Sequence, residues 1–407
     1  MKIFFVSQYF YPEIFKGNDI VFDLIERGHE VTVLTGKPNY PEGKFYKGYN
    51  FFNKNTEYIK GAKVIRVPLF PRKSGKAIPL VLNYFSFLFF SFFVVTFRIK
   101  EKFDVVFVQQ LSPVTMALPG LWVKNRQGIP LVLWVLDLWP ESIVASSNIK
   151  SNFIIKPIEK LVKWIYNKSD LILVSSKFFT ESVLEKCKNK NMKVEHFPNW
   201  AEDVFIKTNK SSIIDYKIPE LPVGFNVMFA GNIGEAQDFE AILIAAELTK
   251  NENVNWLFIG DGRKLDWVKN EVISRKITNI YILGRHPMES MPLFFEKADA
   301  MLVSLKDEPI FSLTVPAKIQ AYMASGKIIL GMLNGEGNVL INESKCGFAV
   351  PAGSSKGLAE IANKLKNFNS EKINEMEFNA VNYYDRFFSK NMLLSKLEKI
   401  LVEIAKK

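Results

Sequence analysis

The stretches KIFFVSQ (Lys2–Gln8) and EVTVLT (Glu30–Thr35) decide the fold of this chain. Each is a nearly continuous apolar run of strand length, and the two are separated by a loop (Tyr9–Asn18) and a helical pattern that ends near Gly28. Two strands joined through a helix are expected to lie parallel in one sheet. Apolar runs without polar alternation are typical of parallel sheets that helices cover on both faces. The N-terminal region is therefore predicted to be an α/β domain.

The same alternation continues along the chain and pauses once, between Phe197 and Pro222. We interpret the pause as a linker between two doubly wound, Rossmann-like domains that face each other across a cleft. We assign residues 1–203 to the first domain, 204–385 to the second, and 386–407 to a C-terminal helix that returns to the first domain. The further predicted strands are Lys63–Leu69, Asp104–Gln109, Pro130–Asp137, Asp170–Ser176, Phe225–Asn232, Val254–Gly260, Ile280–Gly284 and Ala300–Leu305.

Length and composition limit the classes of protein that this chain can represent. A chain of 407 residues is too long for one ordinary core. A net charge of +11 favours an anionic partner, but no nucleic-acid motif accompanies the charge. Two cysteines and three histidines form neither a disulfide framework nor a metal-ligand pattern. The N-terminus reads as a strand rather than a signal peptide, which predicts a cytoplasmic protein.

The stretch SLTVPAKIQAYMASG (Ser312–Gly326) predicts a helix whose first turn can bind a phosphate. Pro316 suits a helix start, and Gly326 suits its end. The first turn of a helix has free N–H groups and a partial positive charge, and Lys318 adds a full charge there. The alternative is an ordinary capped helix packed on a sheet.

Other glycine loops follow strands of the second domain, at Gly231–Gly234 and Gly260–Gly262. Because ligands of such sheets bind at the carboxyl ends of the strands, we expect these loops and Lys318 to share one edge. No GxGxxG follows the first strand, and the first loop contains only Gly17, which argues against a dinucleotide cofactor.

The segment Ala77–Phe97 is uncharged and contains seven phenylalanines. Its length matches a membrane span, and its polar residues do not share one helical face in our interpretation. A true span would place strands of one sheet on opposite sides of a bilayer, so the segment is either a buried crossover helix or a helix that dips into one leaflet. Basic residues bracket it, and they suit an anionic membrane face. The proposed membrane contacts are Lys73, Lys76, Phe85, Phe89, Phe92, Phe93 and Arg98.

Several longer motifs resemble those of a known family. They are Tyr11-Pro-Glu13, Gly28–Gly36, Pro38–Pro41 with Gly43, DLWPES (Asp137–Ser142), Gly231–Gly234, VPAK (Val315–Lys318) and YMASGK (Tyr322–Lys327). The chain resembles the GT-B glycosyltransferases of family 4 over nearly its whole length, and especially the bacterial N-acetyl-L-fucosaminyltransferases of O-antigen and capsule synthesis. The DLWPES and Pro-Asn-Tyr-Pro strings are the specific ones.

The resemblance implies a retaining transfer of a sugar from a UDP donor to an acceptor on undecaprenyl diphosphate, at the inner membrane face. It implies no cofactor besides the nucleotide sugar. Asp137 and Glu141 are the candidates for orienting the acceptor or the sugar, although a helix-capping role fits both equally. The donor-binding candidates are Gly17, Gly231, Asn232, Gly234, Gln237, Arg263, Arg285, Pro316, Lys318 and Glu336.

The chain departs from the family pattern at one place. Many members carry two glutamates eight residues apart, and alignment on Gly326 places Leu313 and Ala321 there. Neither side chain can hold a ribose, so Glu336 becomes the candidate for that role. The chain also contains no Asp-x-Asp, so the sequence does not indicate a metal-clamped diphosphate.

Three other functions compete with this interpretation. A UDP-sugar 2-epimerase shares the fold but needs acid and base groups, and only His29 and His286 lie near plausible loops. A non-catalytic membrane scaffold would explain the missing glutamates and the apolar segment. A nucleic-acid-binding protein would explain the positive charge.

Overall fold

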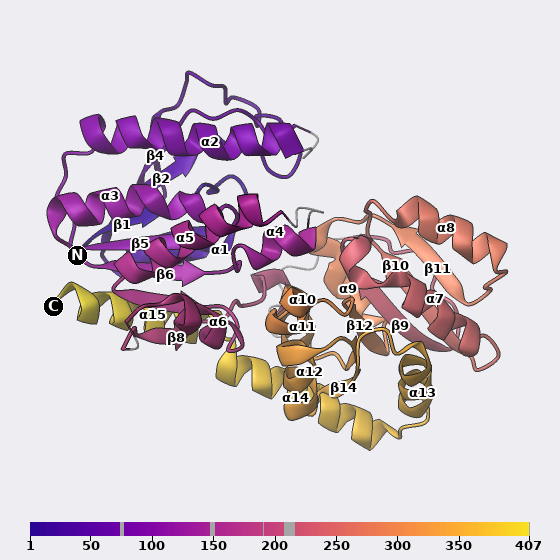
Figure 1. Cartoon of the computed structure of the whole chain (residues 1–407). Coiled ribbons are helices and arrows are strands. Elements are labelled where there is room, and N and C mark those ends of the chain that lie inside the picture. Colours follow the sequence, from indigo (N-terminus) through magenta and orange to yellow (C-terminus); the bar gives the residue numbers. More distant parts are fainter. Residues whose placement is uncertain (74–76, 147–150, 190, 207–215, 407) are drawn as a thin grey trace. The chain divides into compact units, whose positions relative to one another are not determined.

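The computed structural model describes residues 1–73, 77–146, 151–189, 191–206 and 216–406 (Figure 1). The chain forms two compact units, Met1–Pro198 together with the residues from Asn391 onward, and Asn199–Lys390. Our sequence assignment placed the boundary at residue 203 instead. Each unit is described by itself below.

Unit 1 contains an eight-stranded sheet in the order β3-β4-β2-β1-β5-β6-β7-β8. All neighbouring strands are parallel except β3 and β4. The doubly wound α/β class predicted from the sequence is therefore confirmed, while the short strands β3 and β8 were missed. The strands are β1 (Lys2–Val6), β2 (Glu30–Gly36), β3 (Thr56–Ile59), β4 (Ala62–Val67), β5 (Val105–Gln110), β6 (Leu131–Val135), β7 (Leu171–Val174) and β8 (Val194–His196).

The helices of unit 1 follow most strands, as the alternation predicts. They are α1 (Lys16–Glu26), α2 (Ala77–Phe93), α3 (Leu118–Gln127), α4 (Glu141–Ser146), α5 (Asn152–Lys168), α6 (Phe179–Lys186) and α15 (Lys390–Ala405). The last of these, α15, packs on unit 1, where its Glu398 bonds Arg27 and His29 at 3.0 Å each. Lys396 of the same helix donates to the carbonyl of His196 at 2.9 Å.

Unit 2 contains a six-stranded parallel sheet in the order β11-β10-β9-β12-β13-β14. Successive strands are added in one direction from β9 to β11 and in the other direction from β12 to β14, although all of them are parallel. Such sheets bind ligands at this point of reversal, between β9 and β12. Strands β13 and β14 were missed in the sequence because they are short. The strands are β9 (Phe225–Ala230), β10 (Val254–Ile259), β11 (Ile280–Gly284), β12 (Ala300–Ser304), β13 (Ile329–Met332) and β14 (Gly347–Val350).

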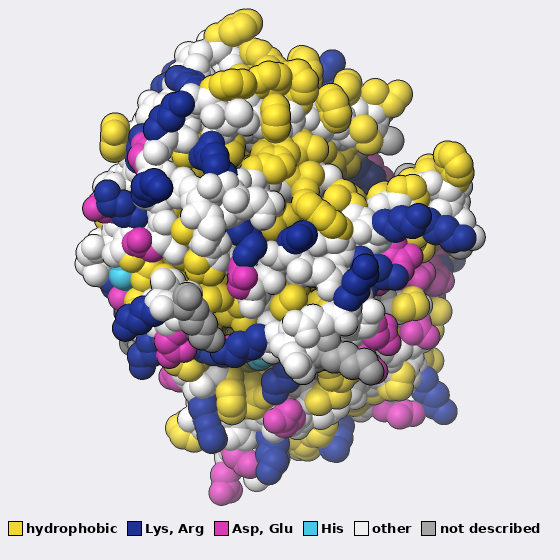
Figure 2. All heavy atoms as spheres, turned by 60° about the vertical axis from the view of Figure 1, so that its left-hand side comes forward, with side chains coloured by type: hydrophobic (Ala, Val, Ile, Leu, Met, Phe, Trp, Pro, Cys, Tyr) yellow, Lys and Arg dark blue, Asp and Glu magenta, His cyan; other side chains and the backbone are white. Residues whose placement is uncertain are grey.

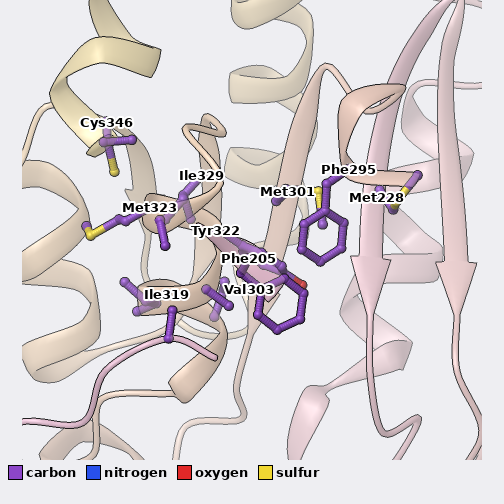
Figure 3. Packing of buried hydrophobic residues seen from close by; sticks show 14 of the residues in the cluster. Phe205, Met228, Phe295, Met301, Val303, Ile319, Tyr322, Met323, Ile329 and Cys346 are labelled. Atoms are coloured by element: carbon purple, nitrogen blue, oxygen red, sulfur yellow. The ribbon is translucent and has the colours of Figure 1, made fainter. Parts of the chain in front are cut away.

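The core of unit 2 occupies both faces of its sheet. Alternate residues of β12 illustrate this, because Met301 and Val303 enter one cluster while Ala300 and Leu302 enter the other. In Figure 3, Tyr322 of α11 lies among the residues of the first cluster. The helices are α7 (Phe239–Leu248), α8 (Leu265–Ser274), α9 (Met291–Glu296), α10 (Pro309–Leu313), α11 (Ala317–Ala324), α12 (Gly335–Glu343), α13 (Ser355–Lys366) and α14 (Ser370–Phe387).

Helix α2 has an inverted amphipathic pattern. Its polar residues Asn83, Ser86 and Ser91 are buried with 0%, 3% and 0% exposure, so they share the face that packs on the unit. This corrects our interpretation for these three residues, because successive helical turns bring them to one side; Thr96, the fourth polar residue of the segment, is exposed as that interpretation implies. Asn83 accepts from Gln8 at 2.7 Å and donates to the carbonyl of Phe70 at 2.6 Å.

The outward face of α2 and of the π-helical turn that follows (Val94–Arg98) is apolar. Figure 2 shows hydrophobic side chains gathered at the top of the view, where α2 lies in Figure 1. Between 44% and 74% of each of these large side chains is exposed, so α2 is not the buried crossover helix that we considered. The residues are Ile78, Val81, Leu82, Phe85, Phe89, Phe92, Phe93 and Phe97.

The stretch Ile78–Arg98 is long and apolar enough to cross a membrane, and 33% of it is buried. Strands β4 and β5, before and after it, belong to one sheet. Of the predicted membrane contacts, Lys73 and Arg98 are exposed and Lys76 lies outside the described residues.

Candidate functional site

The carboxyl edge of the unit 2 sheet is built from two glycine loops that touch backbone to backbone. The N–H of Gly231, after β9, donates to the carbonyl of Ile259 at 2.8 Å. A Cβ atom on Gly260 would lie 1.8 Å from the carbonyl oxygen of Gly231, and one on Gly262 would lie 2.2 Å from that of Ile233. Only glycine permits this approach. The loops that the sequence predicts to share one edge therefore do so.

Lys318 lies in the first turn of α11 and points at this edge. Its Nζ is 3.5 Å from the centroid of the Phe229 ring, and a Cβ atom on Gly231 would be 2.8 Å from its Cε. No acidic side chain of the described residues forms an ion pair with it. Burial lowers the pKa of Lys318 from 10.5 to about 7. A lysine held without a counter-ion at a helix start is suited to an anionic ligand, which would restore its charge.

Some of the other donor-binding candidates hold the loop after β9 in place, and others carry an exposed charge. The N–H of Gly234 donates to Oε1 of Gln237 at 3.1 Å, so Gln237 closes the turn after β9. Asn232 lies against that turn, since a Cβ atom on Gly234 would be 2.4 Å from its Nδ2. Arg263 and Arg285 are exposed after β10 and β11, and neither has an ion-pair partner within the described parts of the chain. These two arginines give the edge its permanent positive charge, and Lys318 adds to it when an anion binds.

Pro316 and Glu336 occupy the starts of two helices. Pro316 caps α11 rather than entering it, as its ψ of 130° shows. Glu336 is in the first turn of α12 and is only 4% exposed. Gly335 before it has a φ of 70°, and a Cβ atom there would overlap the carbonyl of Ser312 at 1.7 Å. The role of Glu336 in holding a ribose stays a prediction.

The two carboxylates of the DLWPES motif are both bonded within unit 1. Asp137 accepts hydrogen bonds from the hydroxyls of Ser112 and Ser142, which tie the loop after β5 to α4. Glu141 accepts from Nζ of Lys186 at 2.5 Å, in a pair that links α4 to α6. Both carboxylates therefore bond other side chains of unit 1, and neither the helix-capping role nor the role in the reaction is shown by these contacts.

Gly17 is buried and is explained by packing. A Cβ atom there would lie 2.3 Å from Oε1 of Gln109 on β5 and 2.9 Å from the Phe5 ring on β1. The glycine thus lets α1 approach the two strands closely. Donor binding by Gly17 remains untested.

Sequence reasoning did not single out Glu13 or Arg72. Glu13 follows β1 and is 1% exposed, and its Oε1 accepts from the N–H groups of Asn39 and Tyr40 at 2.8 and 2.7 Å. Burial raises its pKa from 4.5 to about 7. The quoted Tyr-Pro-Glu motif was a signal for Glu13. Nothing in the sequence pointed to Arg72, because its neighbours come from distant loops.

The histidines that an epimerase would need are engaged elsewhere. His29 immediately precedes β2, at the amino end of the strand, where it bonds Glu398 at 3.0 Å. His286 bonds the hydroxyl of Tyr216 at 2.8 Å and the carbonyl of Leu283 at 2.9 Å. Among the described residues, no group of three or more His, Cys, Asp or Glu side chains could hold a metal ion.

Comparison with known proteins gives the family of both units. Residues 19–203 match the model of Glycosyltransferase Family 4, and residues 224–367 match that of Glycosyl transferases group 1. The two units together have the GT-B glycosyltransferase fold. The GT-B architecture inferred from sequence is thereby confirmed.

Two curated relatives are similar to this glycosyltransferase over much of its length. The "Probable glycosyltransferase WbjE" of Pseudomonas aeruginosa is 28% identical over 268 residues, which is 64% of this chain and 66%, just under two thirds, of that protein. The "Putative colanic acid biosynthesis glycosyl transferase WcaI" of Escherichia coli K12 is 23% identical over 342 residues, or 80% of this chain and 82% of that protein.

Solved structures share the fold of this glycosyltransferase at low sequence identity. Sucrose-phosphate synthase from Thermosynechococcus elongatus has a TM-score of 0.71 at 14% identity and covers 99% of this chain and 98% of its own. Anabaena Alr3699/HepE, in complex with UDP and glucose, has a TM-score of 0.66 at 16% identity and covers 99% of both chains.

Proposed function

We propose that this protein is a retaining glycosyltransferase that moves a sugar from a UDP donor to an acceptor on undecaprenyl diphosphate. We place it at the inner face of the bacterial cytoplasmic membrane, in O-antigen or capsule synthesis. The observation that carries the proposal is the inverted pattern of α2, whose polar residues face the protein while its phenylalanines face outward. A soluble enzyme gains nothing from this arrangement, whereas an enzyme with a lipid-linked acceptor must reach the membrane surface.

The carboxyl edge of unit 2 supports a donor with a diphosphate. When the nucleoside diphosphate leaves, negative charge builds up on its terminal phosphate, and fixed donors stabilise that charge without reorganising. Lys318 and the N–H groups of the first turn of α11 provide such donors. Solved neighbours of the same fold hold UDP and glucose, or UDP-2-fluoro glucose in the case of an Escherichia coli trehalose-6-phosphate protein. We therefore propose UDP as the carrier, with no cofactor and no metal.

The donor sugar is proposed to be an N-acetylated amino sugar such as L-FucNAc. This step rests on the resemblance to the fucosaminyltransferases and on the name of the Escherichia coli relative, which assigns that protein to colanic acid biosynthesis. A panel of UDP- and dTDP-sugars with a lipid-linked GlcNAc acceptor tests it. We expect turnover with a UDP-linked amino sugar, and turnover only with dTDP-sugars would overturn the choice of carrier.

A control without acceptor separates transfer from isomerisation. Incubated with a UDP-N-acetylhexosamine alone, the protein is expected to release UDP slowly or not at all. Accumulation of an epimerised UDP-sugar would instead make it an isomerase.

Flotation with liposomes tests the membrane contact. Burial of one phenylalanine in lipid stabilises by about 1.5–3 kcal/mol, so two or three of them suffice together with basic flanks. We expect the protein to float with anionic liposomes and less with neutral ones. Replacing Phe85, Phe89 and Phe93 by Ser should abolish flotation, whereas Phe378→Ser, at an equally exposed phenylalanine of α14, should not.

The basic residues around α2 form the second arm of this experiment. Replacing them by Gln should weaken binding to anionic liposomes at low salt. If the wild-type protein stays in the soluble fraction, or forms a dimer through this face without lipid, the membrane proposal is wrong. The residues are Lys73, Lys76, Arg98, Lys100 and Lys102.

A further inference from the structure

At the carboxyl edge of the unit 1 sheet, Arg72 packs on aromatic rings rather than pairing with an acidic side chain. The Cζ atom of Arg72, after β4, is 5.1 Å from the ring centroid of Tyr40 and 5.9 Å from that of Tyr9. Its Nη1 donates to the hydroxyl of Tyr9 at 3.3 Å. Tyr9 and Tyr40 are further packed on Phe15, at 5.0 and 5.4 Å between centroids. The rings fix the plane of the guanidinium.

The charge of Arg72 has no counter-ion in the described residues, where no acidic side chain lies within ion-pair distance of it. The Glu13 carboxylate nearby is occupied by backbone N–H groups of the β2 loop. An arginine of this kind has donors left over, and its planar fork matches phosphate oxygens.

Helix α2 is tied directly to this arginine. Oδ1 of Asn39 accepts from the backbone N–H of Arg72 at 3.1 Å and from Nδ2 of Asn83, on α2, at 3.4 Å. Burial raises the pKa of Tyr9, and the neighbouring phenol of Tyr84, the next residue on α2, raises it further. On α2, Val81 and Phe85 flank Tyr84 in the helix and are each 63% exposed. Arg72 is thus connected, through Tyr9 and Asn39, to the helix whose outward face is apolar.

We propose that Arg72, with the hydroxyl of Tyr9, binds the diphosphate of a polyprenyl-linked acceptor while the polyprenyl chain follows the apolar face of α2. This inference rests on the proposed function and deepens it. The two halves of such a ligand, a diphosphate and a hydrocarbon chain attached to it, match a cation and an apolar surface that belong to connected parts of unit 1. A water-soluble nucleotide would bind the cation but would not use the apolar surface. Arg72 is a binding residue, and no bond is made or broken at it.

Binding to vesicles tests the inference without any sugar transfer. Phosphatidylcholine vesicles carry either undecaprenyl diphosphate or phosphatidylglycerol at equal total charge. We expect the wild-type protein to prefer the diphosphate vesicles and Arg72→Gln to lose about tenfold or more of that affinity, as loss of a charge-assisted contact predicts. Arg72→Lys should recover part of it. Arg386→Gln, which removes another arginine stacked on an aromatic ring, at 5.2 Å, should change nothing.

The outcomes separate this inference from the proposed function. The inference would be overturned if the wild type and Arg72→Gln bound diphosphate vesicles with equal affinity. It would also be overturned if Arg72→Gln lost as much affinity for phosphatidylglycerol vesicles as for diphosphate vesicles, because Arg72 would then be a general contact for lipid headgroups. Thermal melting confirms that Arg72→Gln folds, and UDP affinity should stay unchanged. A protein that binds diphosphate vesicles through Arg72 but transfers no sugar would leave this inference standing and sink the proposed function.

Discussion

The carboxyl edges of the two sheets each hold one ionisable side chain whose pKa burial has shifted to about 7, and the shifts have opposite signs. In unit 1 the acid Glu13 is raised from 4.5, and in unit 2 the base Lys318 is lowered from 10.5. Glu13 accepts from the backbone N–H groups of Asn39 and Tyr40, so its hydrogen bonds are complete. Lys318 faces the Phe229 ring and Gly231. We therefore expect a shifted pKa to mark a binding site only where the partners of the group are missing.

The largest effect is expected at Lys318, because its partner is the ligand. Lys318→Met keeps the length and packing of the side chain but removes the ammonium group. UDP affinity should fall by about 10- to 150-fold, since a hydrogen bond to a charged group contributes roughly 1.5–3 kcal/mol, and turnover should fall with it. Titration calorimetry with UDP measures the affinity, and release of UDP from the donor measures the turnover.

Lys318→Ala should lose as much, and a thermal melt should show both variants folded. Because the neutral methionine replaces a buried amine, Lys318→Met should melt no lower than the wild type at neutral pH. Unchanged UDP affinity in both variants would make Lys318 a structural residue and erase the contrast with Glu13.

The next effect is on stability and belongs to Glu13. Glu13→Ala leaves the N–H groups of Asn39 and Tyr40 without their acceptor, which should cost about 1–3 kcal/mol. Glu13→Gln keeps an oxygen for both N–H groups and should lose much less. Urea unfolding compares the variants, and a loss of UDP affinity in Glu13→Gln without a loss of stability would show that Glu13 acts on a ligand.

The dependence of stability on pH should separate the two groups. Between pH 4.5 and about 7 the folded protein keeps the Glu13 proton that the unfolded chain has released, so this contribution to stability is lost as the pH rises through that window. Between about 7 and 10.5 the unfolded chain holds a Lys318 proton that the folded protein lacks, so the cost of burying Lys318 disappears as the pH rises.

Melting temperatures are therefore compared at about pH 5, 7 and 9. Between the two lower pH values, the melting temperature should decline less in Glu13→Gln than in the wild type. Lys318→Met should show a smaller rise on the basic side. Parallel profiles of all three proteins would mean that neither group titrates near neutral pH.

Removing metal ions is expected to have no effect on turnover. If Lys318 and the first turn of α11 neutralise the diphosphate, exhaustive EDTA treatment should leave turnover unchanged. Loss of activity that Mg²⁺ or Mn²⁺ restores would assign to a metal the charge that we assign to Lys318.

The sequence could predict both sheets because their strands are nearly continuous apolar runs. It missed β3, a four-residue strand, because its pairing with β4 depends on a turn rather than on a hydrophobic run. It placed Lys318 correctly in the first turn of a helix that stops at Gly326, since proline and glycine mark helix ends locally. Local signals of this kind need no knowledge of distant residues.

Long-range contacts explain what the sequence could not predict. Glu13 is buried by a loop that lies 26 residues away along the chain, and Arg72 receives its aromatic neighbours from the loops after β1 and β2. The apolarity of α2 and the outward position of Phe85, Phe89, Phe92 and Phe93 were predicted, but the common face of its polar residues was not. Three polar residues in an apolar helix look incidental until the partners Gln8 and Phe70 show that they face the protein.

The inverted face of α2 has a consequence for how often the enzyme meets its acceptor. Both ends of α2 lead into one sheet, so the helix is held flat along the domain instead of swinging as a tether. If the proposed membrane contact holds, the enzyme diffuses in the plane of the bilayer together with the proposed lipid-linked acceptor. Encounter would then be a search in two dimensions, and its rate would depend on the surface density of acceptor rather than on the bulk concentration of the enzyme.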